Sequence, residues 1–407
     1  MEPIYAAAIV LAFIALGELV STWSRARIPG LLVAMLSAFL VVQLGLVPRS
    51  VVDDSMLVEV YTILVAPILF HMGSLIPLRT MVEQWRAVLI ASAGILGAVL
   101  LLSAVVLPMF GFQYFVAGAG PLAGGIIATS LTTDGLVGAG VATAIVVLPS
   151  LILMVQSLPA MPLTNYLLRK YAIRLRESGE LDRLVRLAAA DREAVSAGGS
   201  GRRGSVRTDH RVATRKRLIT LPDFLVDNHL FVLFMVLVGG SVATLMSELS
   251  SIPASILALI LGILSTAIGL TPERTLEKSS SFGIAMAGII AIVMAPLLTA
   301  SLSDVIAALL PMITIIVVGT LGILLGGFVA TKLLGWAPSL GLSVALTAMY
   351  GFPADYLLTH EVARSVGRNP QESEQLTHAM LPAMLVGGFT SVSAGSVVIA
   401  SVLVSFL

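Results

Sequence analysis

Long, almost uninterrupted apolar runs are the feature that most restricts the folds open to this chain. The runs are about 17 to 31 residues long, and a helix needs about 20 apolar residues to cross the hydrocarbon core of a bilayer. Only 12% of the 407 residues are charged, roughly half the share typical of soluble domains. The sequence therefore predicts a polytopic membrane protein. It excludes a secreted enzyme, a nucleic-acid binder and a soluble metabolic enzyme.

Ten of these runs predict full membrane crossings. Two other apolar stretches, Phe112–Asp134 and Pro338–Thr359, are rich in Gly, Ser, Thr and Pro. We expect both to be broken segments that return to the side from which they entered. The predicted crossings are Ile4–Trp23, Pro29–Val47, Leu57–Ile76, Ala87–Phe110, Val137–Leu167, Asn228–Met246, Ile252–Leu270, Phe282–Leu302, Leu309–Leu334 and Ala379–Leu407.

The distribution of Lys and Arg predicts the orientation of the chain. Cytoplasmic loops of membrane proteins carry an excess of basic residues. With the amino terminus outside, Arg49 is the only one of the 24 basic residues that faces outward. We therefore predict a multi-pass membrane protein with both termini outside and the polar segment 169–227 in the cytoplasm.

The two halves of the sequence repeat one another. Ile28–Pro48 and Ile252–Pro272 both begin with Ile-Pro and end with an aliphatic-Gly-Leu-X-Pro string, at identical proline spacing. Further along, Asp134 of the first half corresponds to Asp355 of the second. Each half has five crossings, an odd number, so the second copy is expected to lie upside down. The predicted fold is all-α, with inverted five-helix repeats at 1–168 and 228–407, each containing one broken segment, and a basic linker at 169–227.

The broken segments are the predicted binding site. Broken backbone inside a membrane is tolerated where its freed polar groups line a wet cavity. Half-helix N-termini favour an anionic group, whereas freed carbonyls and hydroxyls suit a sodium ion. We expect Asp134 and Asp355 to line one site near the bilayer midplane, with sodium held at Thr132, Asp134 and Asp355. The predicted substrate- and ion-binding residues are Ser130, Thr132, Thr133, Asp134, Gly135, Thr347, Tyr350, Gly351 and Asp355.

Several polar and small residues also have purely structural interpretations. Asp355 precedes a helical stretch and is a candidate N-cap. The glycines at 239–240 and 326–327 are suited to close helix packing. A structural role is also the simpler interpretation of His71. Gln156–Ser157 contributes to a binding site only if its proline-kinked helix lines the cavity.

Taken in order along the chain, these motifs resemble the bacterial sodium/glutamate symporters. The resemblance depends on the Ile28-Pro29 start of the second crossing, the Leu69–Ser74 string before a basic loop, the Gly/Ser/Thr-rich first broken stretch, Tyr350–Asp355, and His378–Gly388. It implies two inverted five-helix repeats with re-entrant loops, a homodimer, elevator-like movement of a substrate domain and a place in the bacterial inner membrane.

The chain departs from that family's pattern in both broken segments. The family usually has a Gly-Gly-His-Gly-type string in the first segment, where this chain has Ser130–Gly135. In the second segment Pro353–Tyr356 replaces a Gly-rich string. Two additional carboxylates would repel a dicarboxylate unless they are protonated or paired with cations. The substrate could therefore be less acidic or cationic, or the coupling ion could be a proton.

The leading functional hypothesis is a sodium-coupled symporter of a small organic solute, such as an amino acid or carboxylate of the glutamate type. A proton-coupled antiporter in which Asp134 and Asp355 titrate is the main alternative. A channel and an intramembrane aspartyl protease are more remote, because the sequences around the two aspartates do not match those of such proteases. No enzymatic activity is expected. With no cysteine in the chain, disulfides, thiolate catalysis and Cys-ligated metals are excluded, and we expect no cofactor beyond the coupling ion.

Overall fold

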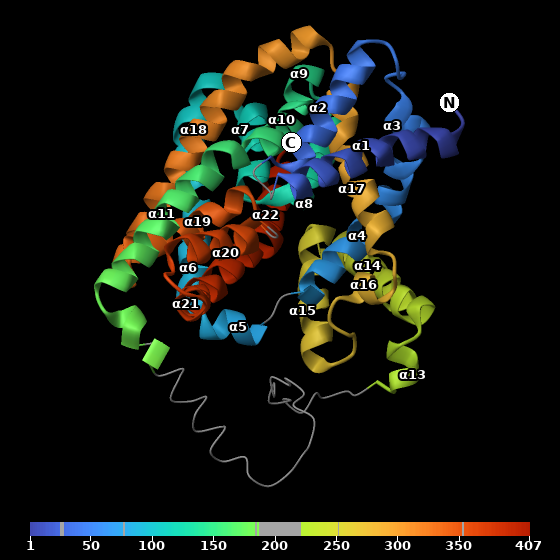
Figure 1. Ribbon diagram of the computed structural model, residues 1–407. Coiled ribbons are helices and arrows are strands. Elements are labelled where there is room, and N and C mark those ends of the chain that lie inside the picture. The colour runs from blue at the N-terminus through green and yellow to red at the C-terminus, as the bar shows by residue number, and fades with distance from the viewer. Residues whose placement is uncertain (25–27, 76–77, 184, 187–220, 251, 352–353) are drawn as a thin grey trace.

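The computed structural model describes residues 1–24, 28–75, 78–183, 185–186, 221–250, 252–351 and 354–407, and every regular element among them is a helix (Figure 1). The first half contains α1 (Pro3–Trp23), α2 (Gly30–Gln43), α3 (Val51–Asp54), α4 (Leu57–Leu75), α5 (Leu78–Glu83), α6 (Trp85–Phe110), α7 (Phe112–Ala123), α8 (Gly125–Gly138), α9 (Thr143–Val146), α10 (Leu148–Val155) and α11 (Ser157–Glu177). The second half contains α13 (Asp223–Val226), α14 (His229–Ser250), α15 (Ala254–Ile268), α16 (Thr275–Lys278), α17 (Phe282–Thr299), α18 (Leu302–Leu333), α19 (Pro338–Leu346), α20 (Ala354–Val366), α21 (Pro370–Phe389) and α22 (Ser396–Val404). A 3-10 turn at Thr347–Met349 follows α19, and a π-helix at Thr390–Gly395 joins α21 to α22.

Eight helical segments among the described residues are long and apolar enough to cross a membrane. This confirms the all-helical prediction and is compatible with a polytopic membrane protein. The segments are Pro3–Ser21, Leu57–Leu75, Trp85–Phe110, Thr143–Glu177, His229–Ser250, Phe282–Thr299, Leu302–Leu333 and Pro370–Val404.

Two of the ten predicted crossings are shorter helices than the sequence suggested. The regions expected to span Pro29–Val47 and Ile252–Leu270 form α2 and α15, of 14 and 15 residues. At a rise of about 1.5 Å per residue these helices are about 21 to 23 Å long, less than the ~30 Å hydrocarbon core. In both copies a proline occupies the N-cap position, and a glycine with positive φ, Gly45 or Gly269, follows the helix. The repeated sequence therefore folds alike in the two halves.

The fifth predicted crossing is displaced along the chain. Its helix runs from Thr143 to Glu177, rather than from Val137 to Leu167. The difference arises at a glycine pair: α8 ends at Gly138, and Gly140 has a φ of +67°. An L-residue rarely adopts that backbone conformation, so the glycines separate two helices that the apolar pattern alone had joined.

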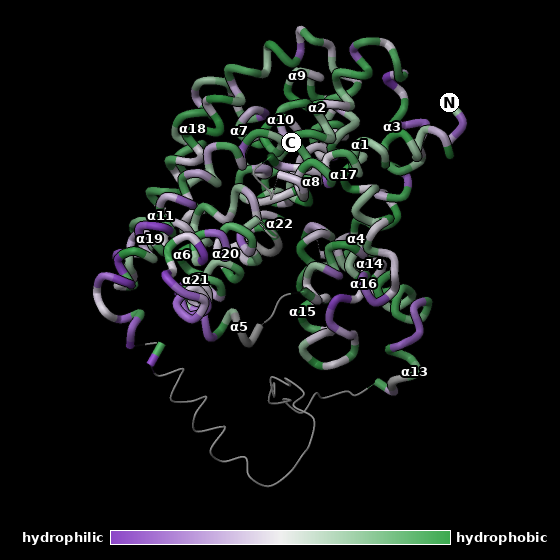
Figure 2. The backbone as a smooth tube through the Cα atoms, in the orientation of Figure 1, coloured by the Kyte–Doolittle hydropathy of each residue, from purple (hydrophilic) through white to green (hydrophobic). Residues whose placement is uncertain are grey.

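The outer surface of the helices is apolar. On α18, Leu310 is 67% exposed and Leu325 57% exposed, and other large apolar side chains lie along the same helix. Figure 2 shows hydrophobic residues along most of the helices, with hydrophilic residues concentrated near their ends and in the connections. Such a continuous apolar exterior is expected where lipid replaces water.

The helices form two bundles. In the first, α1–α4 pack with α14–α17. In the second, α6–α11 pack with α18–α22, and α6 lies along α18 (Figure 1). The bundles meet where α17 contacts α8 and α10, and where α15 contacts α22. Among the described residues, three side-chain hydrogen bonds connect them: Ser150 Oγ to the Val293 carbonyl, Ser255 Oγ to Ser401 Oγ, and Tyr61 Oη to Ser130 Oγ.

Glycines allow neighbouring helices to pack closely within each bundle. A methyl group added to Gly326 on α18 would collide with the Ala93 carbonyl on α6. Methyl groups at Gly239 and Gly240 on α14 would collide with Phe70 and Pro67 on α4. The packing interpretation of these glycines is therefore confirmed.

Candidate functional site

The first broken segment is interrupted between α7 and α8. Gly124 and Gly125 have φ values of +146° and +74°, which only glycine adopts at low cost. A methyl group on Gly125 would lie 2.6 Å from Val392 Cγ1, and one on Gly124 would lie 2.6 Å from the Ser391 carbonyl oxygen. Glycine is thus required at both positions for two reasons: a larger residue would strain the backbone, and its side chain would collide with Ser391 or Val392.

The second broken segment is interrupted in the corresponding part of the other half. The 3-10 turn after α19 leads to Tyr350 and Gly351, and α20 begins at Ala354. Gly351 has a φ of +60°, and a methyl group there would lie 2.7 Å from Val392 Cγ2. One valine side chain therefore lies between the two breaks.

Val392 belongs to the π-helix between α21 and α22. A π-helix contains one more residue per hydrogen-bonded turn than an α-helix and frequently marks a functional site. The sequence pattern does not predict this element. The only local signal is the small-residue string Thr390–Gly395, which α-helical periodicity does not distinguish from an ordinary helix.

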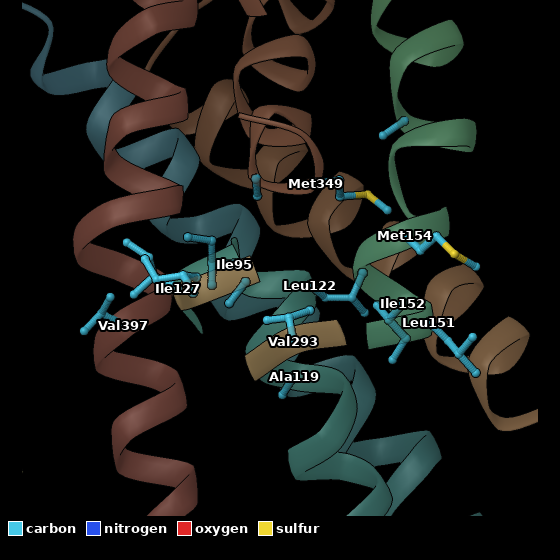
Figure 3. Packing of buried hydrophobic residues seen from close by; sticks show 14 of the residues in the cluster. Ile95, Ala119, Leu122, Ile127, Leu151, Ile152, Met154, Val293, Met349 and Val397 are labelled. Atoms are coloured by element: carbon cyan, nitrogen blue, oxygen red, sulfur yellow. The ribbon is translucent and has the colours of Figure 1, made fainter. Parts of the chain in front are cut away.

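A cavity of about 980 Å³ lies at these breaks. Its wall combines residues from the two breaks, the π-helix, the interruption between α10 and α11, and the connection from α1 to α2. The lining residues are Ser21, Pro29, Gly30, Leu31, Gly125, Ile126, Leu153, Gln156, Ser157, Met161, Met349, Tyr350, Ala354, Tyr356, Leu357, His360, Glu361, Arg364, Ser365 and Val392. Figure 3 shows side chains of the buried apolar core, among them Leu122, Ile152 and Met349, of which Met349 also lines the cavity.

Unpartnered polar atoms concentrate at this cavity. Gln156 is 1% exposed, and its Oε1 has no hydrogen-bond partner. The hydroxyl of Tyr350 is also buried without a hydrogen-bond partner; the neighbouring Thr164 hydroxyl donates to the Ala160 carbonyl, and its oxygen remains able to accept a hydrogen bond. Burying a polar atom without a partner costs about 1 to 3 kcal/mol. Water or a solute in the cavity can supply such partners.

The positive ends of three helices also lie at the cavity. Gly30, Gly125 and Ala354 are the first residues of α2, α8 and α20, and all three line the wall. The first amide groups of a helix have no partners within the helix and carry a partial positive charge. Arg364 adds a full positive charge to the wall, and Glu361 adds a full negative charge. The helix ends and Arg364 favour an anionic group, whereas Glu361 favours a cationic one.

The hydroxyls predicted to bind the ligand occupy several environments. Ser130, Thr132 and Thr347 are buried and donate to carbonyls of their own helices, at 2.8, 2.8 and 2.6 Å. Thr133 is buried, and its Oγ1 has no partner. Gly135 packs against Val404 on α22. Of the predicted site residues only Tyr350 lines the cavity, while Gly351 supports its wall through Val392.

The two aspartates lie in different settings. Asp355 is the second residue of α20 and is 1% exposed, and its Oδ1 accepts the Tyr356 amide at 2.7 Å. Asp134 is the tenth residue of α8 and is exposed. Neither is among the described residues that line the cavity. The structure does not bring the two carboxylates together there, and Asp355 has the local geometry of a helix-terminal acceptor.

Gln156 and Ser157 line the cavity, which is the arrangement in which we expected them to contribute to a binding site. His71 lies apart from this site: its Nδ1 accepts the Leu276 amide at 3.1 Å and contacts the Thr275 hydroxyl. These contacts satisfy the start of α16 and support a structural role. No protein-family model matches the chain, and no curated protein sequence matches it.

Proposed function

We propose that this chain is an ion-coupled secondary transporter of a small organic solute. The observation that carries the proposal is the meeting of the helix breaks of both halves at one cavity that contains buried, unpartnered polar atoms. Transporters built from repeats bind their substrates where discontinuous helices of the two halves meet. A cavity of about 980 Å³ is at the upper end of the size expected for a small-molecule site.

The wall favours an amino acid such as glutamate as the solute. Three helix N-termini and Arg364 suit a carboxylate. The unpartnered Oε1 of Gln156 accepts hydrogen bonds only, so it calls for a donor on the ligand, such as an amino group. An amino acid carries an amino group and a carboxylate on the same carbon atom.

Sodium is the proposed coupling ion, and alternating access the proposed mechanism. Two inverted repeats, each with a re-entrant segment, would give inward- and outward-open states of similar energy. The like folding of the Ile-Pro repeat in both halves and the division into two bundles support this scheme. The resemblance to sodium/glutamate symporters adds an elevator movement of one bundle against the other in a homodimer of the bacterial inner membrane.

The direct test is uptake of labelled glutamate into proteoliposomes, with and without an inward sodium gradient at one pH on both sides. Sodium-dependent accumulation is the expected result, and Tyr350→Phe should reduce it by removing one cavity hydroxyl. Tyr171→Phe is the matched control, because Tyr171 is not among the cavity-lining residues. Accumulation driven by a proton gradient and abolished in Asp134→Asn and Asp355→Asn would favour the proton-coupled alternative.

A thermal-shift screen of small acids, amines and ions extends the test to other solutes. A ligand that binds only the folded state raises the unfolding temperature in a concentration-dependent manner. The proposal fails if no solute stabilises the protein through Gln156 and Tyr350 and no ion gradient drives uptake.

A further inference from the structure

A second cavity of about 790 Å³ lies between α20 and α21. Most of its lining residues have polar or charged side chains. The lining residues are Tyr356, His360, Arg364, Gly367, Arg368, Asn369, Pro370, Ser373, Glu374, Thr377, His378, Leu381 and Pro382. This cavity differs from the cavity at the helix breaks, hereafter the central cavity, because residues of α21 line it and residues of the breaks do not.

The two cavities share three residues of α20. Tyr356, His360 and Arg364 line both of them. Their spacing of four residues places the side chains in one row on the helix. The rings of Tyr356 and His360 are 4.3 Å apart between centroids. The row is therefore the common edge of the two cavities, and a molecule that moves between them passes these side chains.

The polar groups of this row are available to a ligand. Arg364 forms no ion pair or hydrogen bond with another described residue. The Nε2 atom of His360 is buried without a hydrogen-bond partner. A guanidinium offers paired N–H donors that match a carboxylate.

Arg368 differs from Arg364 although it lines the same second cavity. Its guanidinium contacts Glu372 Oε1 at 2.9 Å and Asp182 Oδ1 at 3.4 Å. Hydrogen bonding to the Glu372 carboxylate raises the pKa of Arg368. The charge of Arg368 is thus balanced by ion pairs, whereas Arg364 forms no ion pair with a described residue, although Glu361 and Glu374 line the two cavities with it.

The second cavity lies at the end of the molecule from which the central linker departs. Arg176, near the end of α11, donates to the Val366 carbonyl at the end of α20 at 3.0 Å. Asp182, which follows α11, pairs with Arg368. In Figure 1 the end of α11 and α21 lie at the end of the molecule away from the amino terminus.

We propose that the second cavity is the linker-side entrance to the central cavity, and that Arg364 and His360 form an anion-attracting subsite at the passage between the two. The inference rests on the proposed transport function for its physiological solute. The chemistry that the subsite recognises is a carboxylate-sized anion. The basic linker places this entrance on the cytoplasmic side.

The natural absence of cysteine permits a test that needs no knowledge of the solute. Single Ser→Cys variants are made at Ser373 in the second cavity, Ser365 beside Arg364 in the central cavity, and Ser157 at the α10–α11 interruption. Anionic and cationic methanethiosulfonate reagents are added to either side of phosphatidylcholine proteoliposomes at low ionic strength. Each rate is divided by that of a free small thiol. We expect labelling of all three cysteines from the linker side, with the anionic reagent favoured at Ser365 and Ser157.

Two arginine variants separate this proposal from a general effect of charge. Arg364→Gln should lower the anionic-to-cationic rate ratio at Ser365 about fivefold, because one nearby charge acts on the two reagents in opposite directions. Arg368→Gln should leave the ratio within about twofold, since its charge is already balanced. Ser103→Cys on the outer face of α6 reports reagent access unrelated to the cavities.

An unchanged ratio in Arg364→Gln, or equal changes in the two arginine variants, would overturn the subsite. Labelling of Ser157 only from the side opposite the linker would overturn the entrance. If labelling follows the expectation but no gradient drives solute uptake, the entrance stands and the transport proposal fails. If uptake occurs while Arg364→Gln has no effect on the ratio, the transport proposal stands and this inference fails.

Discussion

Gly125→Ala tests whether the contact with Val392 holds the first helix break in place. Gly125 and Gly45 have the same φ, +74°, but Gly45 has no atom within 4 Å of the position that a methyl group would take. An alanine in this left-handed region costs about 1–2 kcal/mol at either position. At Gly125 the methyl would also lie 2.6 Å from Val392 Cγ1, and such overpacking costs a further ~1–3 kcal/mol. We therefore expect Gly125→Ala to lower the unfolding free energy by about 2–5 kcal/mol, against about 1–2 for Gly45→Ala.

The assay is detergent-driven unfolding followed by tryptophan fluorescence, combined with a double-mutant cycle. Val392→Ala removes both γ-methyl groups, and its Cβ would be 3.6 Å from the new methyl, an ordinary contact. The cycle should therefore return a coupling of about 1–3 kcal/mol between positions 125 and 392. Equal losses of unfolding free energy in Gly125→Ala and Gly45→Ala, or a coupling near zero, would refute the reasoning. The contact with Val392 would then not hold the helix break in place.

Three further predictions address other features. Gln156→Leu should raise the unfolding free energy by about 1–3 kcal/mol, because it removes an unsatisfied buried acceptor, and should abolish solute-dependent thermal stabilisation; a loss of stability would contradict the unpartnered state. Ser150→Ala should cost about 1 kcal/mol by deleting a hydrogen bond between the bundles, whereas Ser103→Ala, which alters only a bond within α6, should cost less in the same unfolding assay. Gly326→Ala should cost about 1–3 kcal/mol by overpacking α6 against α18, and Gly138→Ala, with open space at its methyl position, serves as the unfolding control.

The fold was predictable where local signals are strong. Apolar run length identified the long helices, and the proline before and the glycine after α2 and α15 mark the ends of both short ones. The same runs overestimated the lengths of these helices, because apolar residues continue past Gly45 and Gly269 into non-helical backbone. Hydropathy averages over such residues, whereas φ at a single glycine ends the helix.

The site was predictable only in part. The glycine-rich stretches indicated both breaks, and Tyr350 and Gly351 lie at the cavity or support it. The π-helix depends on packing across several helices, so no local periodicity predicts it. The correspondence of Asp134 with Asp355 came from matching repeats by sequence offset, which does not register that one carboxylate is ten residues into its helix and the other only two. The sequence pattern does not identify Arg364, because its position on both cavity walls depends on how α20 packs.

The π-helix also fixes the rotational phase of the last helix. One residue in an α-helix corresponds to about 100° of rotation, so the wider turn at Thr390–Gly395 offsets the faces of α22 from those of α21. With this offset, Ser401 meets Ser255 on α15 and Val404 fills the space beside Gly135 on α8. Deleting one residue from this segment would restore an unbroken α-helix and turn both contacts away together. A single inserted residue thus determines which side of α22 faces each bundle, and it does so over the whole length of that helix.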